Sequence, residues 1–152
     1  MRKSLLITLL LPALALPFAG CGEKDPVTTP VACLGGPDQW FDALRTIDQD
    51  GPGEDAVRLG GETPLSECLP ADQPAGQQET VGRTVVDVAT FLARASQATN
   101  QTETPGEHTG ASRPAWQAGY LVGALTRGAE ETQGIHASLI QRVEAAATNK
   151  LD

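Results

Sequence analysis

The amino-acid sequence predicts an all-α fold: a small bundle of three to four helices that follows an irregular, disulfide-stapled N-terminal segment. In the second half of the 152-residue chain, apolar residues recur at helical spacing over long stretches. Between residues 51 and 76, glycines and prolines recur every few positions, which disfavours long helices and strands. With 40% apolar and only 4% aromatic residues, the chain has material for one small core.

Residues 1–20 are typical of a secretion signal. Arg2 and Lys3 supply the positive start, and Leu5 to Ala19 form a mostly apolar stretch. This stretch contains Pro12 and Pro17 and is shorter than the roughly 20 apolar residues that a spanning helix needs. We therefore expect a signal peptide that is removed, and no membrane-spanning helix.

The next residues resemble a known signal. Phe18-Ala19-Gly20-Cys21 is similar to the lipobox of bacterial lipoprotein precursors, whose cysteine receives a diacylglyceryl group before the signal is cut away. The resemblance implies a palmitate-type lipid on Cys21 and an extracytoplasmic protein anchored to the cell membrane or the outer membrane. Gly22, in place of aspartate, resembles the outer-membrane cargo of diderm bacteria. The alternative is an ordinary signal peptide cut near Ala19, with Cys21 left as a thiol.

The cysteines support export. If Cys21 carries lipid, Cys33 and Cys68 remain, and in an oxidising compartment they are expected to form a disulfide. The competing use of these thiols is a metal site. There is no Cys-x-x-Cys spacing, and only His108 and His136 are present to complete a site, so we expect no metal and no cofactor.

Composition divides the chain into three parts. Residues 1–20 are the signal peptide, and residues 21–32 have the proline, threonine and charge content of a lipidated flexible tether. Residues 33–152 are expected to form the helical domain. Its first helix is predicted from Asp38 to Ile47, and an irregular segment follows. In that segment residues 56–59 are expected to be extended and Leu65 to Leu69 to form a single turn.

Three further helices are predicted. The first runs from Glu79 to about Thr99, with an apolar stripe at Val81, Val85, Val88, Leu92 and Ala95, and residues 100–111 form a loop. The next begins near Ser112, and its apolar stripe is Ala115, Ala118, Val122, Leu125 and Ala129. The last runs from Ile135 to about Lys150, with a stripe of Ile135, Leu139, Val143 and Ala146.

The helix that begins near Ser112 has few polar residues, so we expect it to be central and buried on most sides. Gly119 and Gly123 lie one turn apart and predict a close approach of another helix, because glycine otherwise weakens a helix interior by about 1 kcal/mol. Trp116 is expected in the core, while Tyr120 keeps its hydroxyl at a wet edge.

The charge balance excludes several partners. Eleven basic residues stand against 19 acidic ones, and without Arg2 and Lys3 the net charge falls from −8 to −10. Nucleic-acid binding needs clustered cations, so no nucleic-acid partner is expected. The same negative charge disfavours docking of the folded body onto anionic phospholipid. We therefore expect the protein to be held at the membrane by the lipid on Cys21 alone.

No catalytic motif is present, and Asp48-Gln49-Asp50-Gly51 fails the calcium-loop pattern beyond its glycine. Four residues are candidates for ligand binding: Trp116, Tyr120, Arg127 and His136. We expect a non-catalytic binding or structural module of the cell envelope, with an unidentified envelope protein as partner. The alternative is a small extracytoplasmic enzyme or ligand-binding protein whose site no local motif shows. A deep pocket that gathers Tyr120, Arg127 and His136 would favour this alternative.

Overall fold

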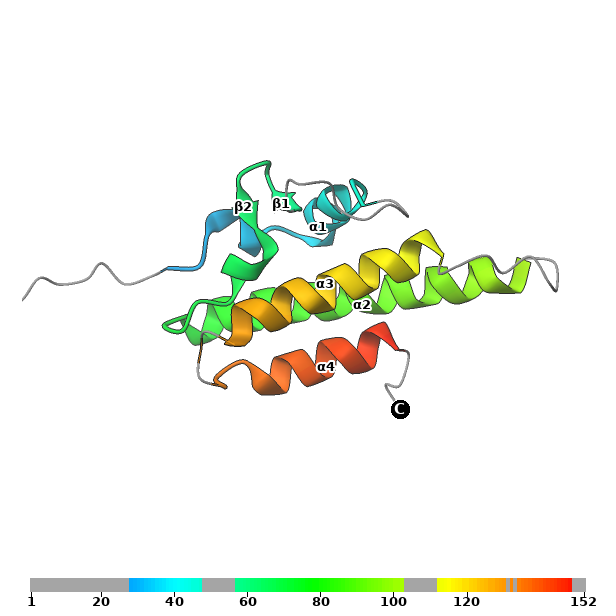
Figure 1. Ribbon diagram of the computed structural model, residues 1–152. Coiled ribbons are helices and arrows are strands. Elements are labelled where there is room, and N and C mark those ends of the chain that lie inside the picture. The colour runs from blue at the N-terminus through cyan, green and yellow to red at the C-terminus, as the bar shows by residue number, and fades with distance from the viewer. Residues whose placement is uncertain (1–27, 48–56, 103–111, 131, 133, 149–152) are drawn as a thin grey trace, which may run out of the picture.

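The computed structural model describes residues 28–47, 57–102, 112–130, 132 and 134–148 (Figure 1). Cys21, His108 and the acidic turn at residues 48–51 lie outside these residues. The described chain is mainly helical, which confirms the all-α prediction. Its elements, in chain order, are η1 (Val31–Leu34), α1 (Pro37–Leu44), β1 (Arg58–Leu59), β2 (Thr63–Pro64), η2 (Leu65–Cys68), α2 (Ala75–Thr102), α3 (Arg113–Glu130) and α4 (Ala137–Ala147), where η marks a 3₁₀ helix.

The three longest helices form an up-down-up bundle. In Figure 1, α3 runs back along α2, and α4 returns along both of them. The shorter elements α1, η1, η2 and the β1–β2 hairpin cover the opposite side of the α2–α3 pair. The two strands pair antiparallel, and the turn between them contains Gly60 and Gly61 at positive φ, which favours glycine. The α2–α3 pair is therefore sandwiched between α4 and this covering layer.

Four of the five residues in the predicted apolar stripe of α2 lie in the core, whereas Ala95 is half-buried. Val81, Val85 and Val88 are fully buried, and Leu92 is 3% exposed. The helix is longer than predicted at both ends. It begins at Ala75 directly after Pro74, and it continues to Thr102 into residues that the sequence indicates as a loop.

α3 begins where the sequence predicts, but the prediction that it is buried on most sides is wrong. Its buried residues form one face: Gln117, Ala118, Leu121, Leu125, Gly128 and Ala129. Trp116 is 45% exposed, so its prediction as a core residue is also wrong. The reason is the position of α3 at the side of the bundle, where α2, α4 and the covering layer leave its outer face open.

The predicted close approach at Gly119 and Gly123 is wrong as well. A Cβ built at either residue would have nothing within 4 Å. The tight contact lies at Gly128, where a Cβ would sit 2.0 Å from the Ser66 carbonyl oxygen. Glycine at position 128 therefore lets η2 lie directly against the C-terminal part of α3.

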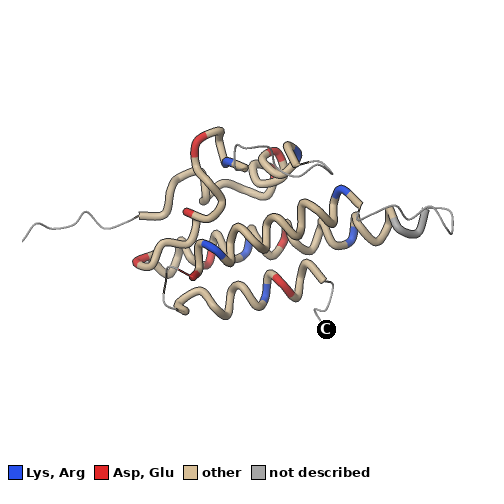
Figure 2. Tube along the Cα trace, in the orientation of Figure 1, with Lys and Arg blue, Asp and Glu red and all other residues tan. Residues whose placement is uncertain are grey.

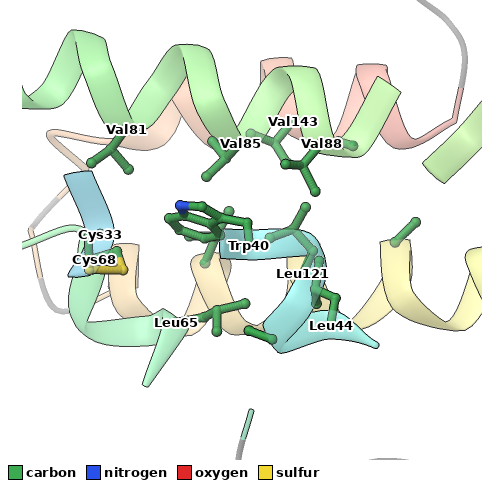
Figure 3. Close-up of a cluster of buried hydrophobic side chains, with 14 of the residues drawn as sticks. Cys33, Trp40, Leu44, Leu65, Cys68, Val81, Val85, Val88, Leu121 and Val143 are labelled. Carbon is green, nitrogen blue, oxygen red and sulfur yellow. A yellow bond between two sulfur atoms is a disulfide. The ribbon is translucent and has the colours of Figure 1, made fainter. Parts of the chain in front are cut away.

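The disulfide between Cys33 and Cys68 confirms the predicted pair. The sulfur atoms are 2.04 Å apart, and both residues are fully buried. The bond joins η1 to η2 at the edge of the core (Figure 3). At the centre of that core, fully buried Trp40 of α1 lies between the valines of α2 and Leu121 of α3.

The folded body begins before residue 33. Thr29 is 4% exposed and accepts a hydrogen bond from Gln73 Nε2 at 2.9 Å, and η1 starts at Val31. Thr29 and η1 thus make contacts with the folded body, within the segment that the sequence assigns to the tether.

α4 is shorter than predicted. It spans Ala137–Ala147 and buries Leu139, Val143 and Ala146 as expected, whereas Ile135 precedes the helix and is 56% exposed. Among the described residues, no helix combines the length and the apolar character needed to cross a membrane.

Candidate functional site

The four candidate residues do not form one site. Tyr120 and Arg127 line the same pocket, which has a volume of about 220 Å³ between α3 and the β2–η2 segment. Trp116 and His136 are not among its lining residues. The structure thus places Tyr120 and Arg127 in one pocket, and His136 does not line any of the main pockets formed by the described residues.

His136 has a structural position. It is fully buried, and its Nε2 lies 3.1 Å from the carbonyl oxygen of Pro70. A carbonyl only accepts, so Nε2 carries the proton, and Nδ1 then accepts from Gln78 Nε2 at 3.0 Å. Both ring nitrogens are therefore occupied. Their bonds join the start of α4 to Gln78 in α2 and to Pro70 in the loop before α2. In this arrangement neither nitrogen is free to act on a substrate.

Tyr120 is half-buried, and its hydroxyl forms a hydrogen bond within the protein. The hydroxyl oxygen accepts the backbone N–H of Val57 at 3.0 Å. This bond fixes the chain just before β1 onto α3. The rest of the pocket wall is mostly apolar or small, supplied by Val57, Pro64, Leu65, Ser66, Gly123 and Ala124.

Arg127 stands between this pocket and a second groove of about 500 Å³. The second groove runs between the start of the described chain, the segment from Ser66 to Asp72, and the end of α3. Arg127 is exposed, and within the described part of the chain no side chain forms an ion pair or hydrogen bond with it. Its guanidinium is thus available to an anionic group, although Glu67 and Asp72 on the far wall lower the local positive potential.

The outer face of α3 is the most distinctive exposed surface. Trp116, Gly119, Gly123 and Arg127 recur at intervals of three or four residues, and all four are exposed. We call these residues together with half-buried Tyr120 the α3 face. The two glycines leave the backbone uncovered, so the Trp116 ring projects beside a flat strip of helix. Large aromatic side chains that stand above flat, accessible surface are typical anchors of protein interfaces.

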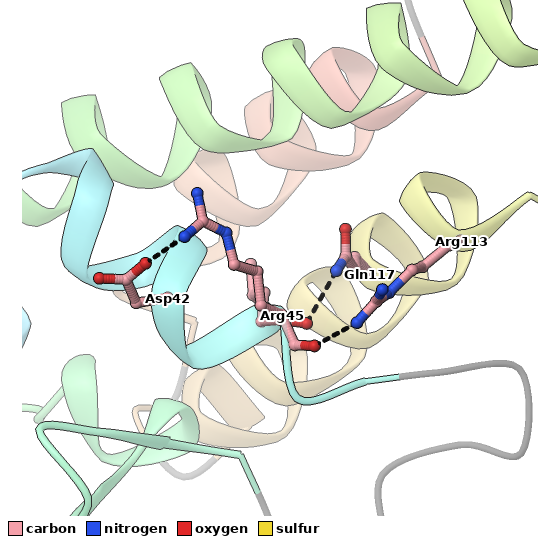
Figure 4. Close-up of polar contacts among 5 residues, drawn as sticks. Asp42, Arg45, Arg113 and Gln117 are labelled. Carbon is pink, nitrogen blue, oxygen red and sulfur yellow. Dashed lines mark hydrogen bonds and ion pairs between the residues drawn. The ribbon is translucent and has the colours of Figure 1, made fainter.

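Sequence reasoning missed the polar contacts that hold α1 against α3 (Figure 4). Buried Gln117 donates from Nε2 to the carbonyl of Leu44 at 2.9 Å. Arg113 donates to the carbonyls of Arg45 and Ile47. Arg113 thus pairs two carbonyls just past the C-terminus of α1, and Gln117 gives the Leu44 carbonyl a second bond beside the one from the Ile47 N–H. In the sequence, the only hint of this role is that Gln117 is the one strongly polar residue between Ala115 and Leu125.

No group of three or more His, Cys, Asp or Glu side chains is placed to hold a metal ion within the described ranges. In the comparisons with known proteins, no family model matches the chain, and no curated protein or solved structure is significantly similar to it.

Proposed function

We propose that the chain is the precursor of a bacterial lipoprotein, anchored outside the cytoplasm by lipid on Cys21, and that its helical body is a non-catalytic binding module of the cell envelope. The lipobox-like run Phe18-Ala19-Gly20-Cys21 supports the anchor. The Cys33–Cys68 bond supports export, since disulfides persist mainly in oxidising compartments.

The observation that carries the binding role is the exposure of Trp116 on the α3 face. A tryptophan that is 45% exposed leaves almost half of its large apolar surface in water, where a partner could bury it. Gly119 and Gly123 each lower helix stability by about 1 kcal/mol, and no contact inside the described body requires them. A partner that packs against this strip would bury the indole and approach the helix backbone closely. The α3 face therefore has the features of a recognition surface.

Substitution of Trp116 tests this role. We expect Trp116→Ala to lower the free energy of unfolding by about 1–2 kcal/mol, less than the roughly 3–5 kcal/mol of a core tryptophan, because the ring is only partly buried. The same variant should lose the proteins that wild type captures from its own envelope. Phe91→Ala is the matched control, because Phe91 is a 59% exposed aromatic on α2 and should retain capture. Capture of the same proteins by Trp116→Ala and wild type would contradict the proposal.

A second candidate function is binding of a small anionic ligand. The 220 Å³ pocket favours it, because it combines an apolar wall with the Tyr120 side chain and an unpaired guanidinium at Arg127. In this case Arg127→Gln, and not Trp116→Ala, abolishes binding. His136 supports neither candidate, since both of its ring nitrogens are occupied.

A further inference from the structure

The described chain enters the bundle at a defined end. Three segments meet there, and we call them the entry end: residues 28–31, residues 69–78, and residues 127–130, 132 and 134–136. Thr29 accepts a hydrogen bond from Gln73, and His136 is bonded to Pro70. The 500 Å³ groove is lined by residues from all three segments. Figure 1 shows η1, the start of α2 and the turn before α4 at the same end of the molecule.

We propose that the entry end faces the lipid bilayer and touches it through Val31 and Ile135; this inference rests on the proposed lipid anchor at Cys21. Thr28 is seven residues from Cys21, a distance of at most about 25 Å even for a fully extended chain. Because Thr29 is fixed in the body, no further residues can lengthen this connection without unfolding. The entry end is therefore held within a short reach of the membrane.

Exposed apolar side chains favour contact at this end. Val31 is 85% exposed and Ile135 is 56% exposed, and each belongs to a different segment of the entry end. The other two large apolar side chains that are exposed in the described residues lie farther along the helices. Phe91 is about 24 Å along α2 from Ala75, and Trp116 is about 17 Å along α3 from Arg127. Contact through the entry end removes Val31 and Ile135 from water and leaves the α3 face around Trp116 accessible.

Charge favours neither the entry end nor the side of the bundle as the membrane contact, because exposed Asp72 and Glu130 lie at the entry end together with Arg127. Acidic positions are distributed over the body among the basic ones (Figure 2), and the mature chain carries a net charge of −10. An acidic body is repelled by anionic phospholipid over its whole length. The lipid supplies the affinity, and the two aliphatic side chains determine which end approaches the headgroups.

Fluorescence quenching by brominated lipids tests this orientation. The mature lipidated protein is reconstituted in phosphatidylethanolamine–phosphatidylglycerol vesicles whose acyl chains carry bromine. Val31→Trp and Ile135→Trp, each combined with Trp116→Phe, report on the entry end. Phe91→Trp with Trp116→Phe and the wild-type Trp116 report on sites away from it. Fully buried Trp40 gives the same background in every sample.

We expect several-fold stronger quenching and a blue shift for the tryptophans at positions 31 and 135. If all positions are quenched equally, or positions 91 and 116 more strongly, the orientation is wrong although the anchor stands. Vesicle flotation separates this from a failure of the anchor itself. A mature protein that carries no acyl chain and does not float with the vesicles overturns the lipoprotein proposal and this inference with it.

Discussion

At the scale of single residues, His136 joins three segments that are distant in sequence. Its ring bonds to Gln78 in α2 and to Pro70 in the loop before that helix, while its backbone carbonyl accepts the N–H of Ile140 in α4. The side chain is fully buried, so the two ring bonds are shielded from water. Loss of the ring would take away the partner of the Gln78 amide and one of the two bonds that the Pro70 carbonyl accepts, and it would leave a cavity.

We therefore predict that His136→Ala lowers the free energy of unfolding by about 2–4 kcal/mol, from the cavity and the two lost hydrogen bonds together. Urea denaturation followed by circular dichroism measures this loss. Ile135→Ala is the matched control next to it in the chain, and it should change stability by no more than about 0.5 kcal/mol because the side chain is exposed. Equal stability of the two variants would show that His136 does not hold the segments together.

Several residue-level predictions from the sequence were right, and the wrong ones share a cause. Helical periodicity identified Val81, Val85 and Val88 correctly, because these residues lie on the one face of α2 that most other elements cover. For α3, periodicity alone does not tell which face is covered. The burial of Gln117 depends on α1 and that of Gly128 on η2, and neither contact is encoded near α3 in the sequence. Trp116 was placed in the core for lack of this information.

At the scale of elements, α3 contains glycines of two kinds. Gly128 lies against the backbone of η2, whereas Gly119 faces open space. An added Cβ at position 128 would clash with the Ser66 carbonyl, which is backbone and belongs to a segment fixed by the neighbouring disulfide. At position 119 the same methyl group would meet nothing.

Alanine at these two positions should therefore have opposite effects. Gly128→Ala should destabilise the domain by at least about 1–3 kcal/mol, because η2 must move away from α3. Gly119→Ala should raise stability by about 0.5–1 kcal/mol, because alanine favours the helix and the space is free. Thermal unfolding of the two variants checks both signs, and destabilisation by Gly119→Ala would show that the α3 face is covered within the domain.

The sequence predicted where the helices lie more accurately than it predicted the residues at which they begin and end. The existence of all four helices was predicted, since each has apolar residues at helical spacing. The end of α2 was missed because residues 100–102 are polar but contain no proline or glycine, so nothing in them stops a helix that is already formed. Thr29 was assigned to the tether because its partner, Gln73, is far away in the sequence.

At the scale of the whole molecule, the disulfide ties the covering layer to the bundle. It closes a loop with a sequence separation of 35, and it joins η1 near α2 to η2 against α3. Closing such a loop lowers the entropy of the unfolded chain by the equivalent of roughly 4 kcal/mol at 25 °C. The intact protein should accordingly melt well above the reduced, alkylated protein in differential scanning calorimetry. Nearly equal melting temperatures would contradict a stabilising role for the bond.

The pairing of Cys33 with Cys68 was predictable because the predicted export and the proposed lipid on Cys21 would leave only these two cysteines. The candidate site was predictable only in part. Tyr120 and Arg127 share a pocket because they lie seven residues apart on one side of α3. Trp116 lies on the same α3 face but one turn before Tyr120, outside the pocket lining, and His136 is buried elsewhere by contacts that depend on the packing of the complete bundle.

The anchor on Cys21 is the central claim of this account, and metabolic labelling with a fatty-acid analogue tests it most directly. Wild-type protein and the control Gly22→Ala should both be labelled and recovered as the shortened mature form. Cys21→Ser should remain uncut by the lipoprotein-specific peptidase and carry no label, because the acceptor thiol is gone. Equal labelling of Cys21→Ser and wild type, or a wild-type protein without label, would contradict the lipoprotein assignment.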